Sequence, residues 1–166
     1  MKILFINSAP YPGGSLIADL KLANLLSENN FDVYFSTYLL NFKEQYPKLK
    51  FLEFKLFNLL KLIRNFDVIF LTESKARDLG FMFKTLNPKA KIFSIRRAKP
   101  RSTKISIKIQ EFFCDKILCV SEDISKSINS KKTFIIYDFV EKIWGIKESL
   151  NYPLVFWYIG RNDYDK

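Results

Sequence analysis

The sequence predicts an α/β protein built on a doubly wound, mostly parallel sheet of six or seven strands. Two observations predict this class. Short apolar runs typical of buried strands alternate with longer segments whose apolar residues recur every three or four positions, the spacing of an amphipathic helix. Parallel strands joined through helices form right-handed crossovers, so helices are expected on both faces of the sheet. A chain of 166 residues can bury the core that such a domain needs.

The first half of the chain contains three predicted strands and two predicted helices. The strands are expected at 2–7 (KILFIN), 31–38 (FDVYFSTY) and 49–54. A helix is expected at 15–29, and a second at 55–65 with its leucine stripe packed on the sheet. These elements alternate in the order that a parallel sheet requires.

The first of these helices has a clear apolar stripe, which consists of Leu16, Leu20, Ala23 and Leu26. Asp19 lies away from that stripe and is expected on the polar face. Ser15 is the expected N-cap, because its hydroxyl can accept a hydrogen bond from the first turn.

The second half continues the alternation and then changes character. Strands are expected at 66–73 (FDVIFLTE), 91–95, 116–122 and 133–140, and helices at 74–88, 103–114 and 123–130. A polar, turn-prone segment follows Val140, and a new apolar strand, LVFWYIGR, begins just before the chain ends. We therefore expect a domain at 1–141, a linker at 142–153 and the first strand of a truncated second domain at 154–166.

Composition excludes several classes of protein. No apolar stretch approaches the ~18–20 residues of a membrane span, and the first residues do not form a secretory signal, so a cytoplasmic protein is expected. The chain has no histidine, which excludes Cys/His zinc sites and Ser-His or Cys-His catalysis. The two cysteines, Cys114 and Cys119, are expected to be reduced and buried.

Positive charge is concentrated in one part of the chain. The formal net charge is +10, and no acidic residue occurs between Leu79 and Gln110. Such a segment attracts anionic partners: phosphorylated ligands, anionic lipid or nucleic acid. A solvated basic face without a partner is the alternative. No nucleic-acid-binding motif is recognisable, so no specific nucleic acid is expected.

The only adjacent glycines, Gly13 and Gly14, stand between the first predicted strand and the first predicted helix. In an open parallel sheet, ligands bind beyond the carboxyl ends of the strands, and a helix N-terminus there favours a phosphate. The alternative is a tight turn that needs a positive φ. Neither a G-x-G-x-x-G fingerprint nor a P-loop is present.

Five segments together resemble one family, in the order in which that family has them. KILFINSAPYPGGSLIADLKLANLLSENNFDVYFST resembles the start of family 4 retaining glycosyltransferases of the GT-B type, with Leu22, Ala23 and Leu26 at the family's helix positions. FDVIFLTE, CDKILCVSEDISKSI, FIIYDFVE and VFWYIGRNDYDK resemble later segments of the same family. The likeness covers almost the whole chain and implies the Rossmann-like N-terminal half of a two-domain protein.

The resemblance implies transfer of a sugar from a nucleotide-sugar donor, a UDP- or GDP-sugar, with retention of configuration and without a bound metal or other cofactor. The residues that it places on the donor diphosphate or sugar are Gly13, Gly14, Arg161 and Lys166. Candidate contacts to the acceptor or the transferred sugar are Glu73, Arg96, Arg97, Ser121 and Glu122. No catalytic residue is assigned.

The sequence departs from the family at three places. Arg96 or Arg97 stands near the position of a family histidine, and an arginine is a poor base. Asp138 and Phe139 replace the family's Asn-Gly. The C-terminal domain, with its Glu-x7-Glu segment, is missing, so the chain alone is expected to be incomplete and inactive. That domain is expected either in the same polypeptide or in a partner chain of a split transferase.

Many relatives act on lipid-linked or cell-envelope acceptors, which gives the positive charge a role. We name Arg96, Arg97, Lys99, Arg101, Lys104 and Lys108 the basic segment. Under this interpretation the basic segment holds the domain reversibly on an anionic membrane, at the inner face. The rival interpretation is a non-catalytic Rossmann-like module that binds a polyanion, either membrane or nucleic acid.

Overall fold

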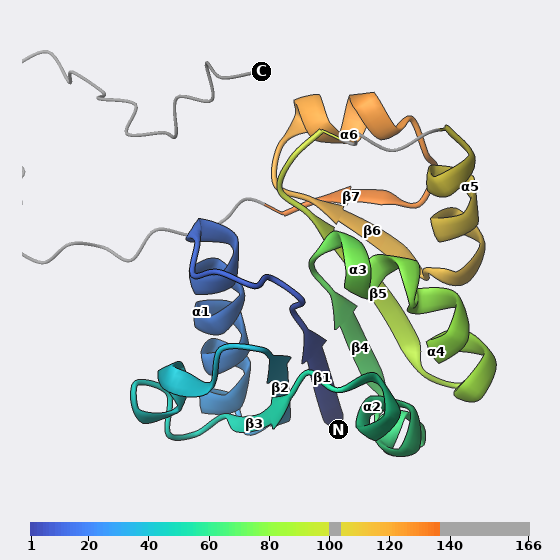
Figure 1. The fold of residues 1–166 in the computed structure, drawn as a ribbon. Helices are drawn as coiled ribbons and strands as arrows, with labels where there is room; N and C mark the ends of the chain where they lie inside the picture. The colour runs from blue at the N-terminus through green and yellow to red at the C-terminus, as the bar shows by residue number, and fades with distance from the viewer. Residues whose placement is uncertain (100–103, 137–166) are drawn as a thin grey trace, which may run out of the picture.

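The described residues form a fully parallel sheet of seven strands, in the order β3-β2-β1-β4-β5-β6-β7 (Figure 1). The computed structural model describes residues 1–99 and 104–136, and for residues 104–106 it describes the backbone only. The strands are β1 (Lys2–Ile6), β2 (Asp32–Thr37), β3 (Lys50–Glu53), β4 (Val68–Leu71), β5 (Lys91–Arg96), β6 (Lys116–Cys119) and β7 (Thr133–Ile135). The predicted fold class is therefore confirmed.

The helices cover both faces of this sheet (Figure 1). They are α1 (Gly14–Glu28), α2 (Leu56–Leu62), α3 (Ser74–Asp78), α4 (Gly80–Leu86), α5 (Lys104–Phe113) and α6 (Glu122–Ile128), with 3-10 turns η1 (Leu40–Glu44) and η2 (Ile63–Asn65). Helix α1 packs on one face, and α2 to α6 contribute to the apolar core of the other. The η1 turn lies in a stretch for which the sequence predicted no element.

Burial on both faces explains why the strands read as continuous apolar runs. In β1, Ile3 and Phe5 point to the α1 side, whereas Leu4 and Ile6 point to the other, and all four are buried. Leu16, Leu20 and Ala23 of α1 are fully buried against the first side. Truncating one of these leucines to alanine typically costs about 2–5 kcal/mol of stability.

A row of phenylalanines crosses four neighbouring strands on the α1 side. Phe5 of β1 stacks on Phe35 of β2 at 5.9 Å and on Phe70 of β4 at 4.5 Å, and Phe70 stacks on Phe93 of β5 at 5.3 Å. The strand register pairs the same residues. Much of the high phenylalanine content is thus core packing, at about 0.5–1.5 kcal/mol per pair beyond burial.

The single helix predicted over 74–88 is divided into α3 and α4. The break falls at Leu79, which is both the C-cap of α3 and the N-cap position of α4. At the next residue, Gly80, an added Cβ would collide with the ring of Phe113 in α5 and with Leu71 of β4. Only glycine allows this approach between α4, α5 and the sheet, so the close packing of α5 lies directly beside the break.

Two further differences concern the ends of elements. The strand predicted over 116–122 ends at Cys119, because Ser121 is the N-cap of α6 and its hydroxyl accepts a hydrogen bond from the N–H of Ile124. Only 133–135 of the strand predicted over 133–140 is observed as a strand. The end of that strand, the linker at 142–153 and the segment 154–166 lie outside the described residues.

Both cysteines are free and buried, as the sequence predicts. Burial raises the pKa of Cys114 to about 12 and raises that of Cys119, so neither thiol ionises at neutral pH.

Candidate functional site

The carboxyl ends of β1 and β4 lie side by side at the centre of the sheet (Figure 1). After β1 the chain continues into α1 on one face, and after β4 it continues into α3, which belongs to the core of the other face. The direction of the connections therefore reverses between these two strands. Such a topological switch point is where open α/β sheets place their ligands.

The glycine pair lies at this switch point, at the start of α1. Gly13 is the N-cap in an extended conformation (φ −157°, ψ 170°), and Gly14 is the first helical residue. Among the described residues, no atom lies within 4 Å of a Cβ added to either glycine. Neither residue has a positive φ, so the tight-turn explanation of the pair is wrong. The two glycines instead leave open space beside the N-terminus of a 15-residue helix.

A hydrogen bond joins the start of α1 to the end of β4 across the switch point. Ser15 Oγ donates to Glu73 Oε1 at 2.8 Å. Ser15 was predicted as the N-cap of this helix, but Gly13 holds that position without a side-chain hydrogen bond. The hydroxyl of Ser15 instead bonds to the side chain of Glu73. Glu73 is half-buried and occupies the N-cap position of α3.

Asp19 of α1 is completely buried, although it was expected on the polar face of the helix. Its Oδ2 accepts a 2.7 Å hydrogen bond from Asn7 Nδ2, and its Oδ1 accepts a 2.5 Å bond from Arg97 Nη1. The spacing contained a signal: Asp19 is three residues after Leu16 and four before Ala23, on the buried side of the helix. An acidic residue on that side indicates a buried polar site.

Opposing effects act on the carboxyl group of Asp19. Burial raises its pKa, while the charge of Arg97 and hydrogen bonds from Thr72, Asn7 and Arg97 lower it. Burial is the largest effect, and the pKa lies above its ordinary value of 3.8. The buried carboxyl group of Asp19 is therefore surrounded by hydrogen-bond donors from residues that follow three strands, β1, β4 and β5.

The adjacent arginines at the end of β5 point to different sides of the sheet. Arg97 reaches Asp19 on α1. Arg96 is 5% exposed, donates through Nη2 to Gln110 Oε1 of α5, and has a buried Nε without a hydrogen-bond partner. Of the two candidates for the family's histidine position, Arg97 is thus the one on the glycine side.

A third arginine ties the ends of β4 and β5 together. Arg77 Nη1 donates to the carbonyl oxygens of Thr72 at 2.7 Å and Ile95 at 3.2 Å. Burial and the neighbouring charge of Arg96 lower the pKa of Arg77 to about 10, so the guanidinium stays charged at neutral pH. Arg77 therefore has a structural role at the site, because it connects the backbone at the ends of β4 and β5.

Ser121 and Glu122 lie after β6, two strands away from β4 in the sheet order. Ser121 caps α6, and the exposed Glu122 forms an i,i+4 ion pair with Lys126 at 3.3 Å. Both predicted contacts therefore have local roles in α6 and are not brought next to the glycine pair. Arg161 and Lys166, the other predicted donor contacts, lie outside the described residues.

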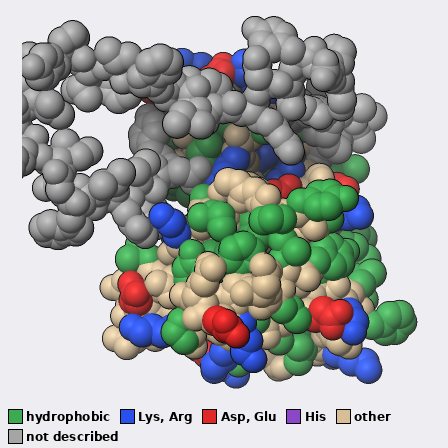
Figure 2. All heavy atoms as spheres, turned by 60° about the vertical axis from the view of Figure 1, so that its left-hand side comes forward, with side chains coloured by type: hydrophobic (Ala, Val, Ile, Leu, Met, Phe, Trp, Pro, Cys, Tyr) green, Lys and Arg blue, Asp and Glu red, His purple; other side chains and the backbone are tan. Residues whose placement is uncertain are grey.

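The basic segment does not form one exposed surface. Arg96 is buried, and Arg97 is 15% exposed and paired with Asp19. Lys99 is exposed and forms a 2.8 Å ion pair with Asp123, and Lys108 is exposed on α5. Arg101 and the side chain of Lys104 lie outside the described part. In Figure 2, which brings the side of α1 forward, Lys and Arg side chains are set back at the upper margin of the described surface.

Within the described residues, no group of three or more Cys, Asp or Glu side chains is arranged to hold a metal ion. None of the helices in that part of the chain has the length and apolar character to cross a bilayer.

The order of the strands and the switch point are those of a Rossmann-like domain, and the solved structures with a similar fold show it as one half of a GT-B protein. HepE of Anabaena, solved in complex with UDP and glucose, matches with a TM-score of 0.68 and 13% identity, over 83% of this chain and 44% of that chain. MurG of Acinetobacter baumannii matches with a TM-score of 0.65 and 9% identity, over 93% and 48% of the two chains. A UDP-N-acetylglucosamine 2-epimerase matches with a TM-score of 0.57 and 9% identity, over 81% and 47%.

At these identities the likeness establishes the fold alone. The chain spans less than half the length of each of these three proteins. No protein-family model and no curated protein matches the sequence.

Proposed function

We propose that the chain is the N-terminal, acceptor-side half of a nucleotide-sugar-dependent glycosyltransferase of the retaining, metal-independent family 4 type. The observation that carries this proposal is that one helix, α1, begins at the open glycine pair and also binds Arg97, through the side chain of Asp19. Two of the structural neighbours support the ligand class, because HepE was solved with UDP and glucose and the epimerase is named for a UDP-sugar.

The chemistry of sugar transfer suits this arrangement. When the bond between sugar and diphosphate breaks, the diphosphate gains negative charge, and fixed donors aimed at that charge stabilise the transition state. Open space at Gly13 and Gly14 lets the backbone N–H groups of α1 approach the diphosphate or the sugar. Arg97 supplies a permanent positive charge and planar donors, but not a base. Arg161 and Lys166 would act from the second domain, and a UDP- or GDP-sugar is the donor.

We further propose that the acceptor is lipid-linked or belongs to the cell envelope. The domain would bind reversibly to the inner face of an anionic membrane. Helix α5 supports this, because it exposes Ile109 (52%) and Phe112 (83%) beside the exposed Lys108. Phe81 of the neighbouring α4 is also half exposed, at 54%. Apolar side chains next to basic ones, on a chain of net charge +10, match the chemistry of an anionic lipid surface. Of the basic segment, this surface includes only Lys108.

Binding of the donor tests the central proposal. In a titration of the 166-residue chain with UDP-glucose, GDP-glucose or UDP, we expect the backbone amide signals of Gly13 and Gly14 to shift. The affinity is expected to be weak, because the second domain must hold most of the nucleotide.

A Gly13→Val variant provides the control. The space beside Gly13 accepts an added side chain, so the fold is expected to persist while the response to the donor is lost. If the parent chain shows no shift with any nucleotide sugar but binds single-stranded DNA or anionic vesicles, the transferase proposal is wrong and the non-catalytic module is favoured.

A further inference from the structure

Asp19 occupies a position at which an apolar residue would be expected on packing grounds alone. It lies in the buried part of α1 between Leu16 and Leu20, and its exposure is 0%. Burying a carboxylate costs several kcal/mol unless its partners compensate, and replacement of buried ion pairs by apolar residues is often neutral or stabilising. The presence of this acid therefore calls for a role other than stability.

The carboxylate of Asp19 is held in place from β1. Asn7, the residue after β1, donates through Nδ2 to Asp19 Oδ2 at 2.7 Å. Asn7 is itself fixed, because its Oδ1 accepts a 2.9 Å bond from the N–H of Ala9 and its N–H donates to the carbonyl of Ser36 at 2.9 Å. One oxygen of Asp19 is thus tied to the rigid centre of the sheet, which fixes the position of the other.

That second oxygen determines the direction of Arg97. Arg97 follows β5 immediately and bonds to Asp19 Oδ1, 78 residues away in sequence. The side chain of Arg97 keeps 15% of its surface accessible. Asp19 lies five residues after Gly14, or about 7.5 Å along the helix axis at the usual rise per residue. The guanidinium is therefore anchored on the helix that begins at the open glycine pair.

We propose that Asp19 is a positioning residue that aims the guanidinium of Arg97 at a phosphate oxygen of the nucleotide-sugar donor beside Gly13 and Gly14. This inference rests on the proposed function. A free arginine side chain loses rotamer entropy when it is immobilised. A carboxylate that holds it in advance removes much of that cost from the binding step.

A double-mutant cycle on donor affinity tests this inference. We expect Asp19→Asn to weaken UDP-glucose binding by the 166-residue chain about tenfold, the scale of one lost charged hydrogen bond. In an Arg97→Gln background, Asp19→Asn is expected to have no further effect, because nothing remains to be aimed. Glu28→Gln is the matched control: it removes one charge from the exposed end of the same helix and is expected to leave the affinity unchanged.

The side-chain nitrogen signals of Arg97 give a readout that does not depend on ligand. We expect slower rotation of the guanidinium in the parent chain than in Asp19→Asn. An equal rotation rate in the two chains, an unchanged affinity, or an equal loss of affinity in both backgrounds overturns the inference. If the parent chain does not respond to UDP-glucose at all, the proposed function fails and the donor-binding role of Asp19 fails with it, even where the rotation result stands.

Asp19→Glu covers the case in which Asp19→Asn does not fold. It keeps the negative charge but displaces the carboxylate by one methylene, so the guanidinium is aimed elsewhere. We expect a loss of affinity similar to that of Asp19→Asn. An unchanged affinity would mean that only a buried charge is needed, and the positioning role would be rejected.

Discussion

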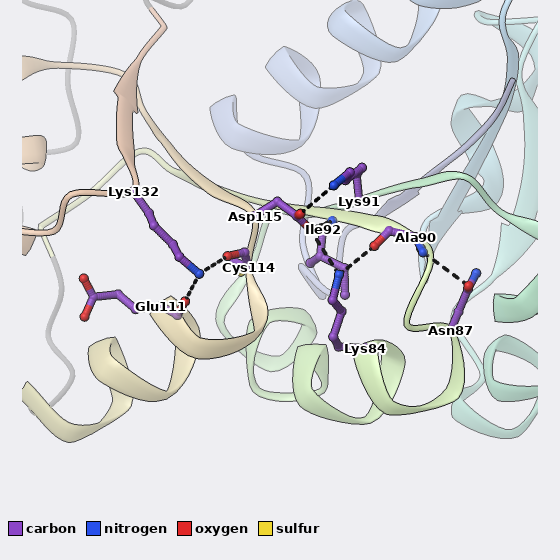
Figure 3. A network of polar contacts seen from close by, with 9 residues as sticks. All are labelled: Lys84, Asn87, Ala90, Lys91, Ile92, Glu111, Cys114, Asp115 and Lys132. Atoms are coloured by element: carbon purple, nitrogen blue, oxygen red, sulfur yellow. Dashed lines mark hydrogen bonds and ion pairs between the residues drawn. The ribbon is translucent and has the colours of Figure 1, made fainter.

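Asp115 and Lys84 form an ion pair at 3.3 Å that joins the residue before β6 to α4 (Figure 3). The other contacts of the carboxylate are with Lys91 at 3.2 Å and with the backbone N–H of Ile92 at 2.9 Å. Burial alone would raise the pKa of Asp115, but these donors outweigh it and hold the pKa below the ordinary value of 3.8. This network lies at the amino ends of β5 and β6, away from the candidate site.

The first prediction follows from the direction of that pKa. A carboxyl group with a lowered pKa adds stability above its unfolded pKa, and the stability is lost as the pH falls through the folded pKa. We expect Asp115→Asn to be less stable than the parent by about 1 kcal/mol at pH 7. Urea unfolding between pH 2 and pH 7 should show this difference shrinking below pH 4. A difference that does not depend on pH would contradict the assignment.

The second prediction contrasts two glycines. Gly14→Ala adds a Cβ that meets no atom, in the first turn of a helix, so it is expected to stabilise the fold by up to about 1 kcal/mol. Gly80→Ala would force the ring of Phe113 to move and is expected to destabilise by about 1–3 kcal/mol. Thermal unfolding measures both effects. A destabilised Gly14→Ala would show that the space beside α1 is already filled.

The class of fold was predictable because it depends on patterns that repeat along the chain. Strands buried on both faces appear as continuous apolar runs, such as residues 3–6, and helices as stripes, such as Leu16, Leu20 and Ala23. The close packing at Gly80, beside the break between α3 and α4, was not predictable, because it involves Phe113, which is 33 positions further along the chain and approaches Gly80 only after α5 has packed.

The candidate site was predictable only where local sequence specifies it. The glycine pair stands at the first strand-to-helix turn in both the sequence and the structure. The partnership of Asp19 with Arg97 joins residues 78 positions apart, and Asp19 was expected on the polar face although its spacing from Leu16 and Ala23 is that of the buried side. Arg96 and Arg97 point to different sides of the sheet. Which side each one faces is set by the backbone at the end of β5, and this can be seen only in three dimensions.

The third prediction concerns the pH dependence of stability at Asp19. A carboxyl group with a raised pKa adds stability that is fully present below its unfolded pKa and is lost as the pH rises through the folded pKa. The parent loses this stability as the pH rises, whereas Asp19→Asn does not. The free energy of unfolding of Asp19→Asn, relative to that of the parent, is therefore expected to increase from pH 4 upward until Asp19 of the folded parent has ionised. This slope is opposite to that expected for Asp115→Asn.

Urea unfolding at intervals between pH 4 and pH 8 measures the slope. Glu28→Gln, which removes an exposed carboxylate from the same helix, is the control and is expected to give a much flatter difference. If the relative stability of Asp19→Asn falls with increasing pH, then Arg97, Thr72 and Asn7 outweigh burial, and the pKa of Asp19 lies below its ordinary value.

The fourth prediction tests the membrane part of the proposed function on α5. Phe112→Ser removes an 83% exposed aromatic side chain, and insertion of such a side chain into an apolar environment contributes about 1.5–3 kcal/mol. Sedimentation with vesicles containing phosphatidylglycerol should therefore show binding weakened by about tenfold or more, and Lys108→Gln should lower it about fivefold. Phe57→Ser on α2, which removes a side chain of similar exposure (79%), is the matched control and should bind like the parent. Equal losses in Phe112→Ser and Phe57→Ser would rule out α5 as the membrane contact, since only general surface hydrophobicity would then be acting.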